Sequence, residues 1–313
     1  MILIFNLKSR MHAVAALLLT VSLVLGACGS SETGNDRLTV VATTSIWGDV
    51  VSQILGEMGE VEVLIPRGAD PHDYQPTSQQ IATVARADLV VANGLGLEEG
   101  VEDILESAES DGANILEVAP GLDPLPFAEH VAETEDEEHG ALDPHVWFDP
   151  NRVARAAVAI ATELEGIDDS VDWIERARAY GEELASADRQ ITEILSVVPD
   201  ESRKLVTNHD AFGYFADTYG FEIVGVIIPG GSTLGEPSSA ELAELVEIIR
   251  ENNVPAIFAE STQPRALAEA IAAEVGRDVA VVELYTGSLG ETPADTLTGM
   301  LIEDARRIAE ALS

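Results

Sequence analysis

The chain has 313 residues, of which 46% are hydrophobic, so it is long enough for two domains of ordinary size. Its 17 Lys and Arg residues against 56 Asp and Glu residues give a formal net charge of −39. A surface this acidic excludes binding to nucleic acid phosphates and to anionic membranes, and it favours cationic partners. The single cysteine, Cys28, excludes an internal disulfide.

Residues 1–27 have the layout of a secretory signal peptide, with basic residues followed by an apolar run at 13–25. The run is too short and wrongly flanked for a transmembrane helix. Its end, Leu25–Cys28, resembles a bacterial lipobox, in which the cysteine is lipidated and becomes the mature N-terminus. A chance cysteine near a cleavage site is the alternative. Because residues 28–37 are small and polar, we expect a flexible tether and a lipid-anchored, extracytoplasmic protein.

Strands and helices alternate in residues 38–169, which predicts βαβ units and a mainly parallel sheet in an N-terminal α/β lobe. A capping box at Thr77–Gln80 opens one of the helices. The predicted strands are Leu38–Ala42, Val61–Ile65, Leu89–Ala92 and Asn114–Val118, and the predicted helices include Ile46–Leu55 and Asn151–Glu165.

The longest periodic segment, 170–199, has apolar residues at alternating spacings of four and three, which predicts one helix ended by Pro199. The expected stripe is Trp173, Ala177, Tyr180, Leu184, Ala187, Ile191, Ile194 and Val198. A helix over 170–198 would be roughly 43 Å long, more than one small domain needs. We therefore predict a rod that links two lobes. A coiled-coil dimer is the alternative, but the seam is short and rich in alanine, and we expect a monomer.

Residues 200–313 repeat the α/β pattern and predict a C-terminal lobe. A second capping box at Ser238–Glu241 opens a helix. The predicted strands are Lys204–Thr207, Phe221–Ile228, Ala256–Ala259 and Val279–Leu284, and the predicted final helix is Ala294–Leu312.

Three histidines, His72, His145 and His209, each lie in a loop or at a strand end, beside Pro or Asp and near aromatic residues. Loops at the carboxyl ends of parallel strands are where α/β sheets bind ligands. Two of the histidines belong to the first lobe and one to the second, so we expect a site between lobes. Three neutral imidazoles favour zinc or a similar transition ion. Aspartates close to them could orient the rings: Asp70, Asp73, Asp143, Asp149 and Asp210. For any one histidine, capping a buried corner is the alternative.

An acidic run at 129–139 is bracketed by His130 and His139 and precedes His145. A solvated loop is the simpler interpretation. A loop that weakly collects cations is the alternative.

The chain resembles the zinc/manganese-specific solute-binding lipoproteins of ABC transporters, the cluster A-I group, from about Leu38 to the C-terminus. The resemblance rests on Asp70-Pro-His-x-Tyr-x-Pro-Thr77, Asp143-Pro-His-Val-Trp-Phe-Asp-Pro150 and Asn208-His-Asp-Ala-Phe-Gly-Tyr-Phe215. It implies two α/β lobes joined by one rigid long helix, with the metal between them, and delivery of the ion to a membrane permease. It also implies that His72, His145 and His209 are the ligands. Manganese-type members usually carry a carboxylate where His209 stands, so the likeness is to the zinc side, with manganese as the alternative.

The chain departs from the family at Gly287, where members commonly have a ligating aspartate. Three histidines leave tetrahedral zinc one ligand short. Glu260, at the predicted end of a neighbouring strand, is our predicted fourth metal ligand. The alternatives are water in that position and a Glu260 that accepts hydrogen bonds from the helix N-terminus near Ser261–Pro264.

We therefore expect an extracytoplasmic metal receptor and not an enzyme. A zinc hydrolase is one alternative, since three histidines and an open position also suit catalysis. The chain has no His-Glu-x-x-His element and no Gly-x-Ser-x-Gly elbow. A surface adhesin is the other alternative, although no sequence feature favours it.

Overall fold

The structure, a computed structural model, describes residues 37–127, 142–276 and 278–313. The predicted signal peptide, Cys28, and the acidic run with His130 and His139 lie outside the described residues. Residues Leu38–Ser313 form one compact unit, and everything below refers to this unit.

The first sheet is four-stranded and parallel, in the order β2-β1-β3-β4. Of its two central strands, β3 is apolar and buried throughout and β1 is apolar and buried from Val40 to Ala42, as expected of strands covered on both faces. The strands are β1 (Leu38–Ala42), β2 (Gly59–Val63), β3 (Leu89–Ala92) and β4 (Ile115–Glu117), and the helices around them are α2 (Ser45–Leu55), α3 (Ser78–Val84) and α4 (Glu102–Ser110), with 3-10 turns η1 (Gly56–Met58) and η2 (Ala119–Gly121). The capping box at Thr77 and Gln80 is confirmed.

The second sheet has the same parallel design, in the order β6-β5-β7-β8. Its strands are β5 (Lys204–Thr207), β6 (Glu222–Val226), β7 (Ala256–Glu260) and β8 (Ala280–Leu284), and its helices are α7 (Gly213–Tyr219), α8 (Ser239–Asn252), α9 (Ala266–Val275) and α10 (Leu297–Leu312), with η5 at Asp200–Ser202. The second capping box, at Ser238 and Glu241, is also confirmed. Two α/β lobes with parallel sheets were therefore predicted correctly from the sequence.

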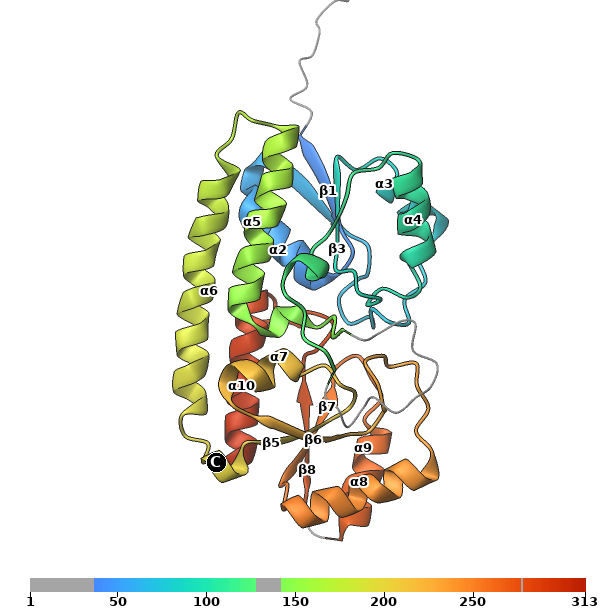
Figure 1. Cartoon of the computed structure of the whole chain (residues 1–313), viewed down its shortest axis with the longest axis vertical. Helices are drawn as coiled ribbons and strands as arrows, with labels where there is room; N and C mark the ends of the chain where they lie inside the picture. Colours follow the sequence, from blue (N-terminus) through green and yellow to red (C-terminus); the bar gives the residue numbers. More distant parts are fainter. Residues whose placement is uncertain (1–36, 128–141, 277) are drawn as a thin grey trace, which may run out of the picture. The chain divides into compact units, whose positions relative to one another are not determined.

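Helix α6 (Trp173–Leu195) follows α5 (Pro150–Ile167) and links the two lobes in the chain. Figure 1 shows it in yellow-green beside α5 and the red α10. It packs against α5 and α2 of the first lobe and against α10 of the second. Its 23 residues make it about 34 Å long, so it is shorter than the predicted 170–199. The lobe boundaries at residues 169 and 200 stay predictions.

The apolar stripe of α6 was predicted correctly except at its end, where Leu195 and not Ile194 is buried. Spacings of four and three average 3.5 residues per turn, whereas a straight helix has 3.6, so the buried face drifts by about 20° per heptad. After three heptads this drift brings Leu195, and not Ile194, to the buried face.

One hydrophobic core runs through both lobes. It joins Trp47 of α2 and Trp147 to Phe212 and Phe258 of the second lobe, through the inner faces of α5, α6 and α10. Separate outer cores lie between the sheet and the outer helices of each lobe. The shared core fixes the distance between the carboxyl ends of the two sheets, where the predicted ligands lie.

Candidate metal centre

His72 comes from the loop between β2 and α3, and its side chain is 3% exposed. Its backbone N–H donates to Asp70 Oδ1 at 3.0 Å, which fixes the turn that carries it. The two ring nitrogens are buried and have no hydrogen-bond partner among the described residues. Glu99 Oε1 lies 3.6 Å from Nδ1, beyond a hydrogen bond. A buried imidazole without a partner is costly unless something else binds it.

His145 lies between two prolines in the segment that leads into η4 (Val146–Phe148) and α5. Asp143 Oδ1 accepts two hydrogen bonds from His145, one from its backbone N–H at 2.9 Å and one from its ring Nδ1 at 2.8 Å. The segment is held on both sides, because Asn93 Nδ2 donates to Pro144 O at 3.0 Å and Tyr214 OH donates to Asp143 O at 2.7 Å. With Nδ1 taken up by Asp143, the Nε2 atom is left for a ligand.

His209 follows the end of β5. It therefore lies at the carboxyl edge of the parallel sheet, where such sheets bind ligands. Its ring Nδ1 is hydrogen-bonded to Glu260 Oε1, and its backbone N–H donates to the same oxygen at 3.2 Å. Thr286 Oγ1 donates to the other oxygen, Oε2, at 2.9 Å. Glu260 is the last residue of β7 and is 1% exposed.

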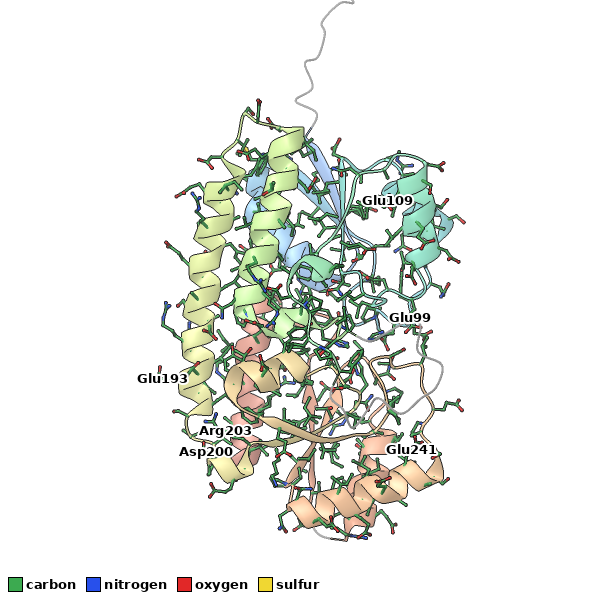
Figure 2. The ribbon with its side chains drawn as sticks, viewed as in Figure 1. Glu99, Glu109, Glu193, Asp200, Arg203 and Glu241 are labelled. Carbon is green, nitrogen blue, oxygen red and sulfur yellow. The ribbon has the colours of Figure 1, made fainter. Side chains whose placement is uncertain are left out.

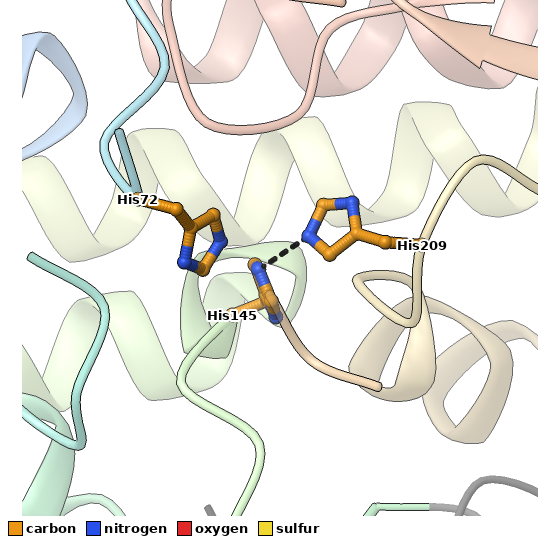
Figure 3. Close-up of side chains that lie close together, drawn as sticks. All are labelled: His72, His145 and His209. Atoms are coloured by element: carbon orange, nitrogen blue, oxygen red, sulfur yellow. Dashed lines mark hydrogen bonds between the residues drawn. The ribbon is translucent and has the colours of Figure 1, made fainter. Parts of the chain in front are cut away.

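The three histidines converge, as Figure 3 shows, with ring centroids 4.9 to 5.5 Å apart. The Nε2 atoms of His145 and His209 lie 3.1 Å apart. One nitrogen from each of the three rings lies within 4.8 Å of the others, and all three side chains are buried. In the described part of the chain, this trio is the one group of three or more His, Cys, Asp or Glu residues with the spacing of metal ligands.

The surroundings of the site shift the pKa values of His145 and His209 in opposite directions. Burial lowers the pKa of His145 well below its usual value, and the nearby His209 and His72 lower it further. Burial also acts to lower the pKa of His209, but the charge and hydrogen bond of Glu260 outweigh it, so that pKa is raised. Burial likewise acts to raise the pKa of Glu260, but His209 outweighs it and that pKa is lowered. His145 is therefore neutral and ready to bind a cation, whereas a proton on His209 competes with one.

The structure places Glu260 behind His209 and not among the three nitrogens. Its oxygens are engaged by His209 and by Thr286, an arrangement in which a carboxylate orients a ligating ring. These contacts support a role for Glu260 as the ring partner of His209, and the direct ligand role predicted for it stays a prediction. The sequence alone could not distinguish a Glu260 that binds the metal from one that orients His209, because both roles require a carboxylate at the end of β7.

The aspartates that were predicted to orient the rings have different contacts in the structure. Asp143 orients the ring of His145 and Asp70 fixes the backbone of His72. Asp149 instead caps α5 and pairs with Arg152, at 2.5 Å. Asp73 is exposed. Asp210 is buried as well; burial raises the pKa of Asp143 well above its usual value, and the nearby charge of Asp210 raises it further.

Sequence reasoning missed Glu99, the acidic residue closest to the ring of His72. It lies in the turn after β3 and also accepts a hydrogen bond from Ser232 Oγ at 2.5 Å. Figure 2 labels it beside the loops that meet between the two sheets. No sequence signal distinguishes it from the neighbouring Glu98, which is bound to Thr43 inside the first lobe.

The chain is similar to proteins of known kind over nearly its whole length. Residues 40–311 match the family described as zinc-uptake complex component A, periplasmic. The manganese-binding lipoprotein MntA of Halalkalibacterium halodurans is 30% identical over 304 residues, which cover 95% of this chain and 97% of MntA. The iron-binding protein YfeA of Yersinia pestis is 32% identical over 262 residues, 82% of this chain and 81% of YfeA.

Solved structures agree with the sequence comparison. The periplasmic zinc-binding protein TroA of Treponema pallidum superposes with a TM-score of 0.79 at 30% identity, over 88% of this chain and 99% of TroA. The names of these relatives include zinc, manganese and iron, so similarity to them does not by itself select one metal.

Proposed function

Because the chain belongs to the family of periplasmic components A of zinc-uptake complexes, we propose that it captures zinc outside the cytoplasm and delivers it to an ABC permease. The observation that carries the choice of zinc is the 3.1 Å between His145 Nε2 and His209 Nε2. With Zn–N bonds of about 2.0 Å, the nitrogens of a tetrahedral zinc lie roughly 3.3 Å apart. Two rings from different lobes are thus already at the spacing that the ion requires.

His72, His145 and His209 are the proposed ligands. Asp143 and Glu260 each hold the Nδ1 atom of one ring, which leaves Nε2 to the ion. Glu99 stands in the corresponding place beside Nδ1 of His72, at 3.6 Å. An acidic side chain therefore lies near Nδ1 of each ligand, hydrogen-bonded to it in His145 and His209 and beyond hydrogen-bond distance in His72.

A neutral three-nitrogen set favours zinc over manganese, since manganese prefers carboxylate and water oxygens. Manganese stays the second candidate because MntA is one of the relatives. A zinc hydrolase is supported less well, because the relatives are named as metal-binding proteins, and nothing further favours an adhesin.

The proposed location is the outer face of the cell membrane, with a lipid on Cys28 as the anchor and residues 28–37 as the tether. Within the described residues, none of the helices combines the length and apolarity needed to cross a membrane. We propose that the folded part is a monomer that docks on its permease and needs no nucleic acid or membrane surface for binding.

Metal analysis of protein purified without added metal, followed by competitive zinc and manganese titrations, tests this function. We expect one zinc per chain and a weaker dissociation constant for manganese. Equal or tighter manganese binding would overturn the choice of zinc. Turnover of ester, phosphate or peptide substrates by the zinc-loaded protein would favour the hydrolase instead.

A further inference from the structure

The β6–α8 loop, residues 227–238, begins beside the ligand of the second lobe. Ile228 N–H donates to Asn208 O at 2.7 Å, and Gly230 O accepts from Asp210 N–H at 3.2 Å. Residues 208 and 210 flank the histidine that the second lobe supplies. The first part of the loop is therefore fixed to the backbone that carries this histidine.

Two consecutive hydroxyl groups further along the loop reach the first lobe. Ser232 Oγ donates to Glu99 Oε1 at 2.5 Å, and Thr233 Oγ1 donates to Asp70 Oδ2 at 2.6 Å. Gln263, which lies between β7 and α9, donates to the same oxygen of Asp70. Hydrogen bonds from a hydroxyl to a carboxylate at such distances are charge-assisted and strong. The second lobe therefore holds both carboxylates by neutral donors.

The same two carboxylates are the acidic neighbours of His72. Asp70 Oδ1 accepts from the His72 backbone N–H at 3.0 Å, and Glu99 Oε1 lies 3.6 Å from ring Nδ1. His145 and His209 differ, because each has its Nδ1 hydrogen-bonded to a carboxylate. Neither ring nitrogen of His72 has such a partner among the described residues. His72 therefore depends on the opposite lobe for the placement of its acidic neighbours.

We propose that Ser232 and Thr233 are positioning residues for His72, which act by fixing the two carboxylates beside it. Both are partly exposed, so their hydrogen bonds can break in a local opening of the loop that frees His72 without separating the lobes. His72 is then the ligand that the ion loses first. The inference deepens the proposed function and rests on it for the identity of the cargo, whereas the two hydrogen bonds are present without metal and can be measured there.

The first test removes both hydroxyls with little change in shape, in the variant Ser232→Ala/Thr233→Val. Zinc should bind about tenfold more weakly, the scale for loss of a group that orients a ligand, and most of the change should be a faster dissociation rate. Tyr219→Phe removes a hydroxyl that is bonded to Asp188 at 3.0 Å; it is the matched control and should behave as wild type. Unchanged zinc affinity and dissociation rate in the loop variant would overturn the proposal.

A double-mutant cycle on zinc affinity separates positioning from a general loss of structure. If the hydroxyls act through His72, their removal should cost little in a His72→Ala background, where the ring that they position is gone. In a Glu260→Gln background, which changes the partner of His209, most of the cost should remain. A loss in the His72→Ala background as large as in wild type would overturn the proposal.

Amide hydrogen exchange of the metal-free protein is the third test. Exchange in residues 228–234 should be faster in the loop variant than in wild type, with the amides of β5 and β7 unchanged. Unchanged exchange in the loop would contradict its role in holding the carboxylates. Wild type that binds no zinc would instead overturn the proposed function, and faster exchange confined to the loop would still support that role.

Discussion

The Nε2 atom of His145, from the first lobe, lies 3.1 Å from the Nε2 atom of His209, from the second. At this distance one nitrogen donates a hydrogen bond and the other accepts it, or a cation binds both. A proton and a metal ion therefore compete for the same place.

This competition predicts that zinc affinity falls as the pH is lowered. Glu260 raises the pKa of His209, so the proton should begin to compete above the ordinary histidine value of about 6.5. Below the raised pKa, zinc must displace a proton; above it, the affinity should level off. Calorimetric titrations in buffers from about pH 5 to 8 measure this. Flat affinity between about pH 7 and 5 would argue against histidine ligands.

Glu260→Gln should weaken zinc binding about tenfold or more, a change of about 1.4 kcal/mol. The amide can still accept from His209 Nδ1 and still meet Thr286, so we expect the stability of the metal-free protein to change little. If Glu260 acts by orienting His209, the variant should also move the pH midpoint of zinc binding downward, because the carboxylate charge that raises the pKa is gone. Loss of affinity with an unmoved midpoint would favour direct ligation, and unaltered affinity would leave Glu260 a structural role.

His145→Ala should reduce zinc affinity severely, by a hundredfold or more, because it removes a ligand whose position is fixed by Asp143. His130→Ala and His139→Ala should change it little, since a solvated acidic run only raises the local cation concentration. Competition with a zinc-binding dye ranks the three variants. A larger effect of either substitution in the 129–139 run would mean that the site is misplaced.

Asp304→Asn should stabilise the fold at neutral pH by about 1–3 kcal/mol, because the neutral amide avoids the cost of burying an acid that the unfolded chain ionises in water. Asp304 is 1% exposed on α10; Oδ1 accepts from Tyr285 N–H at 3.0 Å, whereas Oδ2 has no partner among the described residues. Burial raises its pKa well above the usual value.

The sign of the pH effect follows from that shift. Between the ordinary value of about 3.9 and the raised pKa, the folded protein binds a proton that the unfolded chain has lost, so stability falls as pH rises. Denaturant unfolding across this window should show a shallower fall in the variant. Glu310→Gln, an exposed change on the same helix, is the control and should follow wild type.

Cys28→Ser should release the protein from the membrane, because the lipid is its proposed anchor. Fractionation of cells after a high-salt wash, which removes peripheral association, measures this. A variant that stays with the washed membranes would contradict the lipobox interpretation.

Local patterns in the sequence were enough to predict two parallel α/β lobes, both capping boxes and the three converging histidines. Alternating strands and helices leave few topologies open, and parallel strands deliver their carboxyl ends to one edge of a sheet. The stripe of α6 was predicted for the same reason, because burial of one helix face follows from spacing alone.

Only the tertiary structure decided which groups contact the histidine rings. Glu260 at the end of β7 could have been a ligand or a ring partner, and the choice depends on where His209, some fifty positions earlier in the chain, places its Nδ1. A Cβ atom at Gly287 would meet Pro71, which is far away in sequence. These relations arise where the two lobes meet, and a packing contact between distant segments leaves no periodic trace in the sequence.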